Sequence, residues 1–128
     1  MKFLSTGLLF ISFFLNVFAV DMYDEIASAI QTGNAKQLGS YFDSNVDLSV
    51  SSQEDVYSKA QAELLVKDFF SKNQPKTFAL VHKGASKEGT MFAVGTLACA
   101  NGKTFRTSFV MKTMNGKNVI QELRFEVQ

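Results

Sequence analysis

The feature that most constrains this chain is a series of apolar segments with strand-like alternation, joined by turn sequences, in its C-terminal part. The segments span residues 77–83, 90–100, 103–114 and 117–127. Two of the three connections are the pairs Asn101-Gly102 and Asn115-Gly116, and Asn-Gly between alternating apolar runs is the strongest short hairpin signal. We therefore predict a C-terminal meander of four antiparallel strands. The pattern leaves the register of the Asn101-Gly102 hairpin open.

Alternation also assigns side chains to the inner face of this meander. The predicted inward set is Phe105, Thr107, Phe109 and Met111 in the third segment, and Val119, Gln121, Leu123 and Phe125 in the fourth. A two-residue loop at Asn115-Gly116 would place Phe109 opposite Glu122, so that apolar and charged side chains would share a face. A three-residue loop, with a bulge and Gly116 in the left-handed conformation, pairs Phe109 with Gln121 instead. We therefore predict the bulged hairpin.

Upstream of the meander, the pattern predicts three helices and one short strand. The helices are expected over residues 22–32, 35–42 and 58–72, with caps at Asp21, Asn34 and Ser58, and the strand over residues 46–50. Residues 51–55 are polar and turn-like. Helices followed by strands indicate an α+β fold in which three N-terminal helices pack on one face of a curved antiparallel sheet. That sheet is expected to contain the short strand and the four-strand meander.

The N-terminus has the pattern of a secretory leader. Lys2 precedes an uncharged apolar run over residues 3–17, and Ala19 is a small residue suited to cleavage. The run is shorter than the ~20 apolar residues that span a bilayer, so a cleaved leader is favoured over an anchor. We expect residues 1–19 to be a signal peptide and residues 20–128 a single exported domain, periplasmic or secreted. Stable membrane insertion after cleavage is not expected.

Charge and cysteine content restrict the partners further. Without residues 1–19, which hold Lys2 and no acidic residue, twelve basic residues face twelve acidic residues. This balance argues against nucleic acid as the main partner, because such partners favour a basic face. Cys99 is the only cysteine, so an internal disulfide cannot form, and we expect a buried thiol.

The sequence contains none of the common motifs for catalysis or for phosphate or zinc binding. It has no phosphate-binding glycine loop, zinc-ligand spacing or nucleophile elbow. His82 shares strand parity with Phe78 and Leu80, and an imidazole at the end of an apolar inner face can act as acid or base. A strand-end histidine in solvent is the simpler interpretation. Thr107 and Gln121 are polar groups on the inner face, where they bond a ligand or satisfy each other.

Three stretches resemble a known family. The first is residues 28–36 with Tyr41-Phe42, the second residues 56–62 with 67–70, and the third residues 95–97 with 120–124. Together with the leader, they resemble small exported proteins of Bacteroidetes classed as a domain of unknown function. The resemblance implies a cone-like fold similar to nuclear transport factor two (NTF2), ketosteroid isomerase and cystatins. It implies no catalytic residues, and fold alone does not determine function.

These observations favour a non-catalytic binding module that holds a small apolar ligand or a protein partner between helices and sheet. The pocket candidates are Tyr41, Tyr57, Phe70, His82, Thr107, Met111 and Gln121. No catalytic residue, metal or cofactor is assigned. One alternative is an acid/base enzyme of the isomerase or dehydratase type that uses His82 with Tyr57 or Tyr41. Another is a structural domain that forms a homodimer through the outer sheet face, where Val110 and Ile120 are expected among charged residues.

Overall fold

The computed structural model describes residues 21–128, which form three helices and six strands. The elements in chain order are α1 (Met22–Gln31), α2 (Ala35–Ser40), β1 (Phe42–Val50), β2 (Gln53–Ser58), α3 (Lys59–Lys72), β3 (Pro75–Ala85), β4 (Thr90–Cys99), β5 (Thr104–Met114) and β6 (Lys117–Val127). The predicted α+β class and the N-terminal placement of the helices are confirmed. The predicted leader, residues 1–19, lies outside the described residues.

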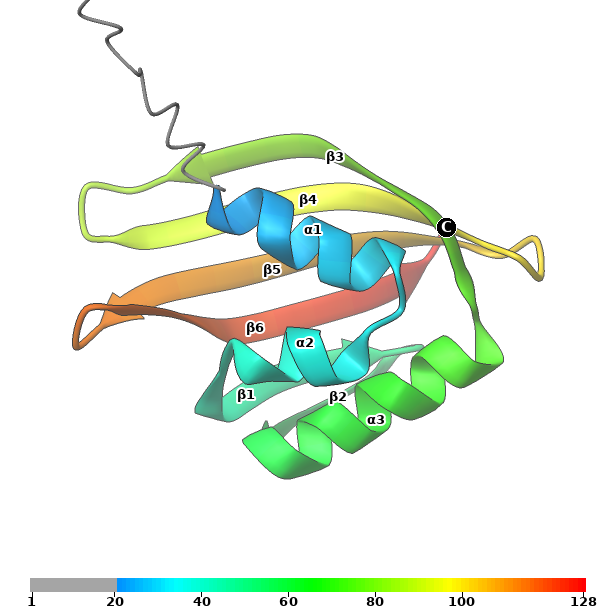
Figure 1. Cartoon of the computed structure of the whole chain (residues 1–128), viewed down its shortest axis with the longest axis horizontal. Coiled ribbons are helices and arrows are strands. Elements are labelled where there is room, and N and C mark those ends of the chain that lie inside the picture. Colours follow the sequence, from blue (N-terminus) through cyan, green and yellow to red (C-terminus); the bar gives the residue numbers. More distant parts are fainter. Residues whose placement is uncertain (1–20) are drawn as a thin grey trace, which may run out of the picture.

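The six strands form one open sheet in the order β2-β1-β6-β5-β4-β3. All neighbouring pairs are antiparallel except β1 and β6, which are parallel, so the sheet is mixed and not purely antiparallel as predicted. The three helices lie on the same side of this sheet, with α1 crossing the meander and α3 beside β1 and β2 (Figure 1). Residues 21–128 contain no helix that is long and apolar enough to span a membrane.

The helices begin where their capping residues predict. The carboxylate of Asp21 accepts a hydrogen bond from the Tyr23 N–H at 3.0 Å, and the Asn34 side chain accepts one from the Gln37 N–H at 3.0 Å. The Ser58 hydroxyl likewise accepts from the Gln61 N–H at 3.3 Å. These bonds satisfy backbone donors that the first turn of a helix otherwise leaves unpaired.

The core lies between the helices and the inner face of the sheet. Its largest fully buried side chains come from the meander, from α1 and α2, and from β1, and include Phe105, Phe109, Phe125, Ile26, Ile30, Leu38 and Leu48. Thr107 and Met111 are completely buried, which confirms the predicted inner face of β5. Cys99 is also buried, and this burial raises the pKa of its thiol.

The predicted bulge at Gly116 is wrong. Asn115 and Gly116 have φ values of 51° and 75°, and Met114 pairs with Lys117, so the connection is a tight two-residue turn. The register shifts farther along β6, between the pairs Met111–Ile120 and Val110–Glu122, which leaves Gln121 as the extra residue. Phe109 consequently pairs with Leu123.

The shift at Gln121 reverses the predicted face for the start of β6. Ile120 is completely buried, whereas Val119 pairs with the outward Lys112. Leu123 and Phe125, beyond the shift, are buried as predicted. The homodimer alternative therefore loses Ile120 from its outer face.

The region before α3 contains more strand than predicted. Phe42, expected on the second helix, starts β1, where it is buried and pairs with Ile120 of β6. The segment expected to be a turn, residues 51–55, supplies a two-residue connection and the first half of β2. Because β2 pairs along its length with β1, this hairpin extends the sheet beyond the predicted five strands.

Candidate functional site

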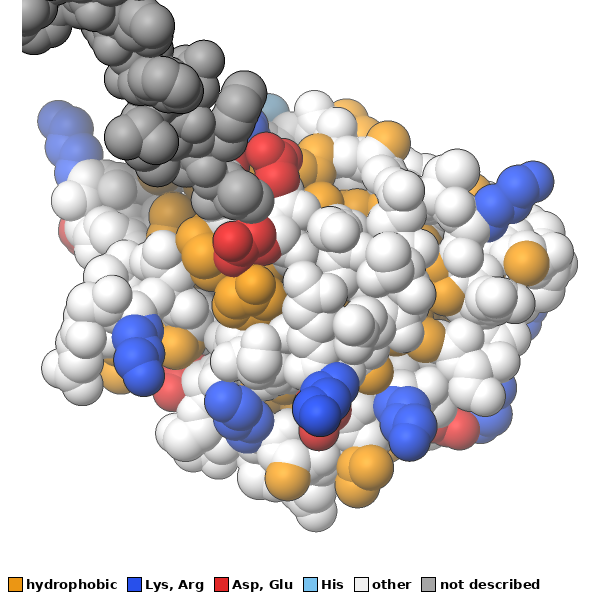
Figure 2. All heavy atoms as spheres, in the orientation of Figure 1, with side chains coloured by type: hydrophobic (Ala, Val, Ile, Leu, Met, Phe, Trp, Pro, Cys, Tyr) orange, Lys and Arg blue, Asp and Glu red, His pale blue; other side chains and the backbone are white. Residues whose placement is uncertain are grey.

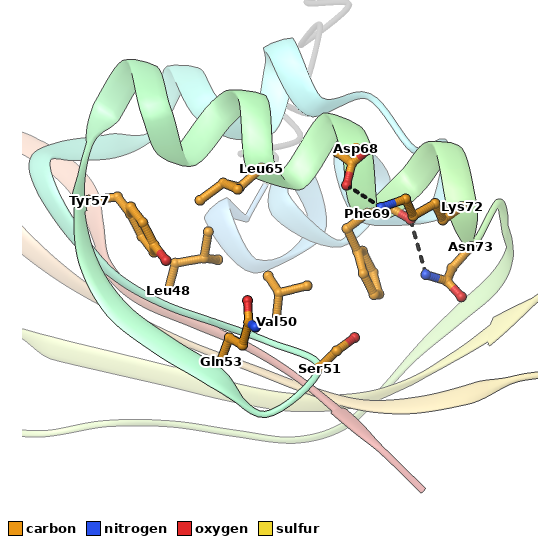
Figure 3. A pocket seen from close by; sticks show the side chains of 10 residues that line it. All are labelled: Leu48, Val50, Ser51, Gln53, Tyr57, Leu65, Asp68, Phe69, Lys72 and Asn73. Atoms are coloured by element: carbon orange, nitrogen blue, oxygen red, sulfur yellow. Dashed lines mark hydrogen bonds and ion pairs between the residues drawn. The ribbon is translucent and has the colours of Figure 1, made fainter.

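A cleft of about 280 Å³ opens between the β1–β2 hairpin and α3. Ten side chains line it, drawn from β1, its turn, β2 and α3: Leu48, Val50, Ser51, Gln53, Tyr57, Leu65, Asp68, Phe69, Lys72 and Asn73 (Figure 3). Its volume is near the lower end of the range for small-molecule sites. The cleft is the candidate functional site.

One side of the cleft is apolar because two periodicities converge on it. Leu48 and Val50 occupy alternate positions of β1, and Leu65 and Phe69 are separated by one helical turn on α3. Phe69 is buried and stacks on Phe125 of β6, with the ring centroids 4.4 Å apart. Leu65 remains 38% exposed, so the cleft has an apolar wall open to a ligand.

The opposite part of the lining is polar. Lys72 and Asp68 form an ion pair on α3 at 3.0 Å, with most of both side chains exposed. Exposed pairs of this kind contribute about 0–1 kcal/mol, so their main effect here is to place opposite charges at the rim.

Asn73 provides the one polar side chain of the lining that is buried. Its Nδ2 donates to the Phe69 carbonyl at 3.2 Å, and its Oδ1 accepts from Asn101 Nδ2 at 2.9 Å. Asn73 is therefore held in place by hydrogen bonds to the end of α3 and to the β4–β5 connection.

The turn at the cleft has an unusual backbone. Ser51 and Ser52 have φ values of 50° and 72°, a region that residues other than glycine and asparagine rarely adopt. The two-residue hairpin connection requires this conformation, since primed turns match the twist of the flanking strands. Backbone strain of this kind concentrates at functional sites, and here it lies in the lining of the cleft.

Of the predicted pocket residues, only Tyr57 lines the cleft. Thr107 and Met111 are enclosed in the core, and the Thr107 hydroxyl donates to the Phe105 carbonyl at 3.5 Å. Phe70 is buried, with its ring 5.8 Å from that of Phe125.

Tyr41 is committed to another interaction. Its hydroxyl donates to Glu25 of α1 at 2.9 Å. Partial burial and this bond to Glu25 raise the pKa of Tyr41. Tyr41 is therefore a link between α1 and the end of α2.

The predicted inward position of Gln121 is wrong, and of the two interpretations of His82 the solvent-exposed one is confirmed. Gln121 is the extra residue of β6, and its amide reaches the exposed Met114 Sδ at 3.6 Å. In β3 the register shifts between Leu80 and His82, so Val81 is the extra residue and the parity that linked His82 to Leu80 is broken. His82 is exposed, with its ring 5.6 Å from that of Phe92.

Most of the cleft residues were not predicted, because the hairpin that positions them has little periodic signal. β2 is exposed at almost every residue, and an exposed acidic strand resembles a turn. The spacing of Leu65, Phe69 and Lys72 on α3 and the alternation of Leu48 and Val50 were the signals available. Within residues 21–128, no three side chains of His, Cys, Asp or Glu gather as a metal site would require.

Comparisons with known proteins assign the chain to a family. The family model named "Domain of unknown function (DUF4783)" matches residues 23–126. A DUF4783 family protein from Bacteroides fragilis is 28% identical, with a TM-score of 0.77 over 84% of this chain and all of that one. The comparison with curated proteins found no significant match.

More distant structures share the fold alone. A protein whose name includes NTF2 is 19% identical, with a TM-score of 0.63 over 79% of this chain and 90% of its own. A domain of unknown function with a cystatin-like fold from Nostoc punctiforme is 7% identical, with a TM-score of 0.65 over 83% of this chain and 72% of its own. The family match covers nearly all of the described residues, and the chain belongs to the DUF4783 family.

Proposed function

We propose that this protein is an exported, non-catalytic binding module whose cleft between the β1–β2 hairpin and α3 receives an apolar group of a small ligand or a protein partner. In this proposal the hairpin and α3 form the open end of a cone-like fold. Export rests on the leader pattern of residues 1–19.

The observation that supports the proposal is the composition of the cleft. Leu48, Val50 and Leu65 supply an apolar wall, while Asn73 offers a fixed polar end whose side chain is already bonded. Pockets that bind small molecules combine an apolar lining with a few positioned polar groups in this way.

The acid/base alternative lacks the arrangement that it requires. His82 is exposed beside Phe92, and it does not line the cleft that contains Tyr57. A general base must lie within hydrogen-bond reach of the proton that it removes, in a site that a substrate can occupy. The geometry therefore favours binding over acid/base chemistry at His82.

Adjacent residues of α3 provide a matched test of the cleft. Leu65 lines the cleft, whereas Leu64 is 63% exposed and borders a separate groove beside α2. With the apolar dye anilinonaphthalene sulfonate as probe, Leu65→Glu should weaken binding about tenfold, because it buries a charge against an apolar group. Leu64→Glu should leave the affinity unchanged. Equal affinities for the two variants would contradict the proposed site.

Native mass spectrometry of protein purified from its own cell envelope tests the nature of the occupant. A co-purified small molecule that Leu65→Glu removes would support the cleft as a ligand site. A bare monomer with no retained ligand would count against a tightly bound small molecule.

A homodimer through the outer sheet face is the second candidate. The helices leave this face uncovered, and Phe92 on β4 is 38% exposed beside the half-buried Val94 and Val110. Arg106 and Glu126 lie 4.0 Å apart on neighbouring strands. Sedimentation of wild type and of Phe92→Lys tests this candidate: a dimer that the variant splits supports it, and a monomeric wild type rejects it.

A further inference from the structure

The strand β2 is a terminal strand of the sheet, and it is unusually accessible. Gln53, Glu54, Asp55 and Val56 are all exposed, and the Val56 side chain is 62% exposed. A terminal strand carries a row of backbone groups with no partner strand, which is a template for another extended chain.

The hairpin turn determines which backbone groups of β2 are free. A two-residue turn makes Val50 and Gln53 a hydrogen-bonded pair, and such pairs alternate along an antiparallel ladder. Gln53, Asp55 and Tyr57 therefore bond to β1. The backbone groups of Glu54 and Val56 point away from the sheet.

An independent contact on β1 agrees with this assignment. The N–H of Ser51, the turn residue directly after β1, donates to the Phe125 carbonyl of β6 at 3.3 Å, so the backbone at this position faces β6. Alternate residues along β1, such as Val50, must then face β2. The free edge at Glu54 and Val56 follows from both observations.

The free edge lies next to the cleft. Gln53 and Tyr57 line the cleft with their side chains (Figure 3). Their backbone groups alternate along β2 with those of the free edge. A strand added along β2 would place every second side chain on this inner side, next to the exposed part of Leu65. One inward apolar residue of such a strand would enter the cleft.

The charges at this edge favour a basic residue in the added strand, two positions away from its inward apolar residue. Glu54 pairs with Arg124 at 2.8 Å and Asp68 pairs with Lys72, whereas no ion pair within residues 21–128 includes Asp55. The Asp55 carboxylate accepts the Val56 N–H at 2.7 Å. A peptide strand whose carbonyl accepts the Val56 N–H would free the Asp55 carboxylate from this bond. A lysine or arginine on the inner side of that peptide strand can then form an ion pair with Asp55.

The other edge of the sheet is less open. β3 begins at Pro75 and is interrupted at Val81, and both features weaken strand addition. The Gly84 carbonyl of β3 accepts the Tyr23 hydroxyl of α1 at 2.7 Å. Figure 2 shows Lys and Arg side chains over the region of α2 and α3 on the helix side, whereas the exposed residues of β2 include the acidic Glu54 and Asp55.

We propose that β2 is a docking edge for an extended peptide segment of a partner protein. The segment adds to Glu54 and Val56 as a further strand, inserts an apolar side chain into the cleft and places a Lys or Arg two residues away against Asp55. This inference rests on the proposed binding function of the cleft, and it names the partner class as an extended basic–apolar peptide.

The test uses a panel of labelled eight-residue peptides, rich in threonine, in which one apolar and one basic residue stand two positions apart. Fluorescence anisotropy with the full chain should detect binding, and N-methylation of alternate peptide amides should weaken it about tenfold by removing edge hydrogen bonds. Replacing the basic residue with glutamate should also weaken binding. Absence of binding by every member, or indifference to N-methylation, would overturn the proposal.

Two variants of the edge sharpen this test. Val56→Pro removes an N–H that faces away from β1, so the β1–β2 ladder keeps its bonds while the edge loses a donor. Peptide affinity should fall about tenfold, whereas Val56→Thr, which keeps the N–H, should bind as wild type does. Equal affinities for these two variants, both folded by circular dichroism, would overturn the proposal.

The dye experiment on Leu64 and Leu65 distinguishes the proposed cleft from the proposed strand addition at β2. If Leu65→Glu loses dye binding but peptides ignore the edge, the cleft binds ligands and strand addition is rejected. If Leu65→Glu changes neither dye nor peptide binding, the proposed function fails as well.

Discussion

The meander and β2 belong to one sheet, but different forces hold them. The inner side chains of β5, among them Phe105 and Phe109, are almost completely buried, whereas β2 is exposed along nearly its whole length. The meander is thus stabilised by apolar burial, as is β1, whereas β2 depends on its ladder to β1 and on α3. Binding regions are commonly drawn from parts of low local stability, and the cleft lies at that end of the molecule.

The sharpest way to test this difference is to remove a ring where the two regions meet. Phe125 of β6 is completely buried and contacts Phe69 and Phe70 of α3. Phe125→Ala should lower the free energy of unfolding by about 4 kcal/mol, because it leaves a cavity in a packed core. Urea denaturation measures this loss. As the counterpart in the hairpin, Val56→Ala should cost less than about 1 kcal/mol, and similar losses for both variants would refute the contrast.

Two glycines test the tight packing of the meander against that of a helix by adding a single methyl group. A Cβ at Gly95 of β4 would lie 2.6 Å from the Ala79 carbonyl oxygen and from the Phe78 ring, so the backbone must shift. Gly95→Ala should destabilise the protein by about 2–3 kcal/mol through overpacking.

Gly39 of α2 is the matched control for Gly95. The three atoms nearest to its added Cβ all belong to the flexible side chain of Glu63, the nearest at 2.8 Å. Because alanine also favours the helix by about 0.5–1 kcal/mol, the net effect of Gly39→Ala should be smaller than that of Gly95→Ala. Thermal and urea unfolding of both variants measure the difference, and a larger loss at Gly39 would contradict it.

The turn of the hairpin offers a change in the opposite direction. Replacing Ser51-Ser52 with Asn-Gly places residues suited to positive φ where the structure requires it. The free energy of unfolding should rise by about 1 kcal/mol. If the native turn serves the cleft, dye or peptide affinity should fall in the same variant. Unchanged stability would show that the serine turn is not strained.

The smallest expected effect concerns the start of α1, which connects to the meander. The hydrogen bond from the Tyr23 N–H, together with Lys83, lowers the pKa of Asp21 in the folded protein. A depressed carboxyl pKa adds stability above the unfolded pKa near 4, and this stability is lost as the pH falls through the folded value. Asp21→Asn keeps the cap but not the charge.

Wild type should therefore be slightly more stable than Asp21→Asn at pH 7, by less than about 1 kcal/mol because the pair is exposed. The two should converge as the pH falls through the lowered pKa of Asp21. Urea midpoints from pH 7 down to strongly acidic pH measure this. A constant difference across that range would exclude a role for the Asp21 charge.

The meander could be predicted because its strands carry their own signals. Asn-Gly turns and alternating apolar residues determine the strands, and burial of Phe105 and Phe109 follows from their parity. One detail of the meander was predicted wrongly. An extra residue is needed to keep Phe109 from pairing with Glu122, but an extra residue at Gly116 or at Gln121 corrects the alternation of faces equally well. Only the three-dimensional path of the strand decides between them.

Most residues of the cleft could not be predicted from the sequence, for a different reason. Asp55 and Glu54 have low intrinsic preference for strands, and β2 forms because β1 supplies a partner after a tight turn. A neighbouring strand is a tertiary influence, which no local pattern contains. Tyr57, one of the predicted pocket residues, does line the cleft.

The parallel pairing of β1 with β6 has a consequence for the order in which the fold is completed. β6 occupies the position between β1 and β5, so the strand made last in the described chain connects the first strand to the rest of the sheet. Contacts between such distant segments close late and slow folding. We therefore expect the N-terminal half to stay without its sheet partner until residues 117–127 have left the ribosome. A chain shortened before β6 should lose both halves of the sheet together.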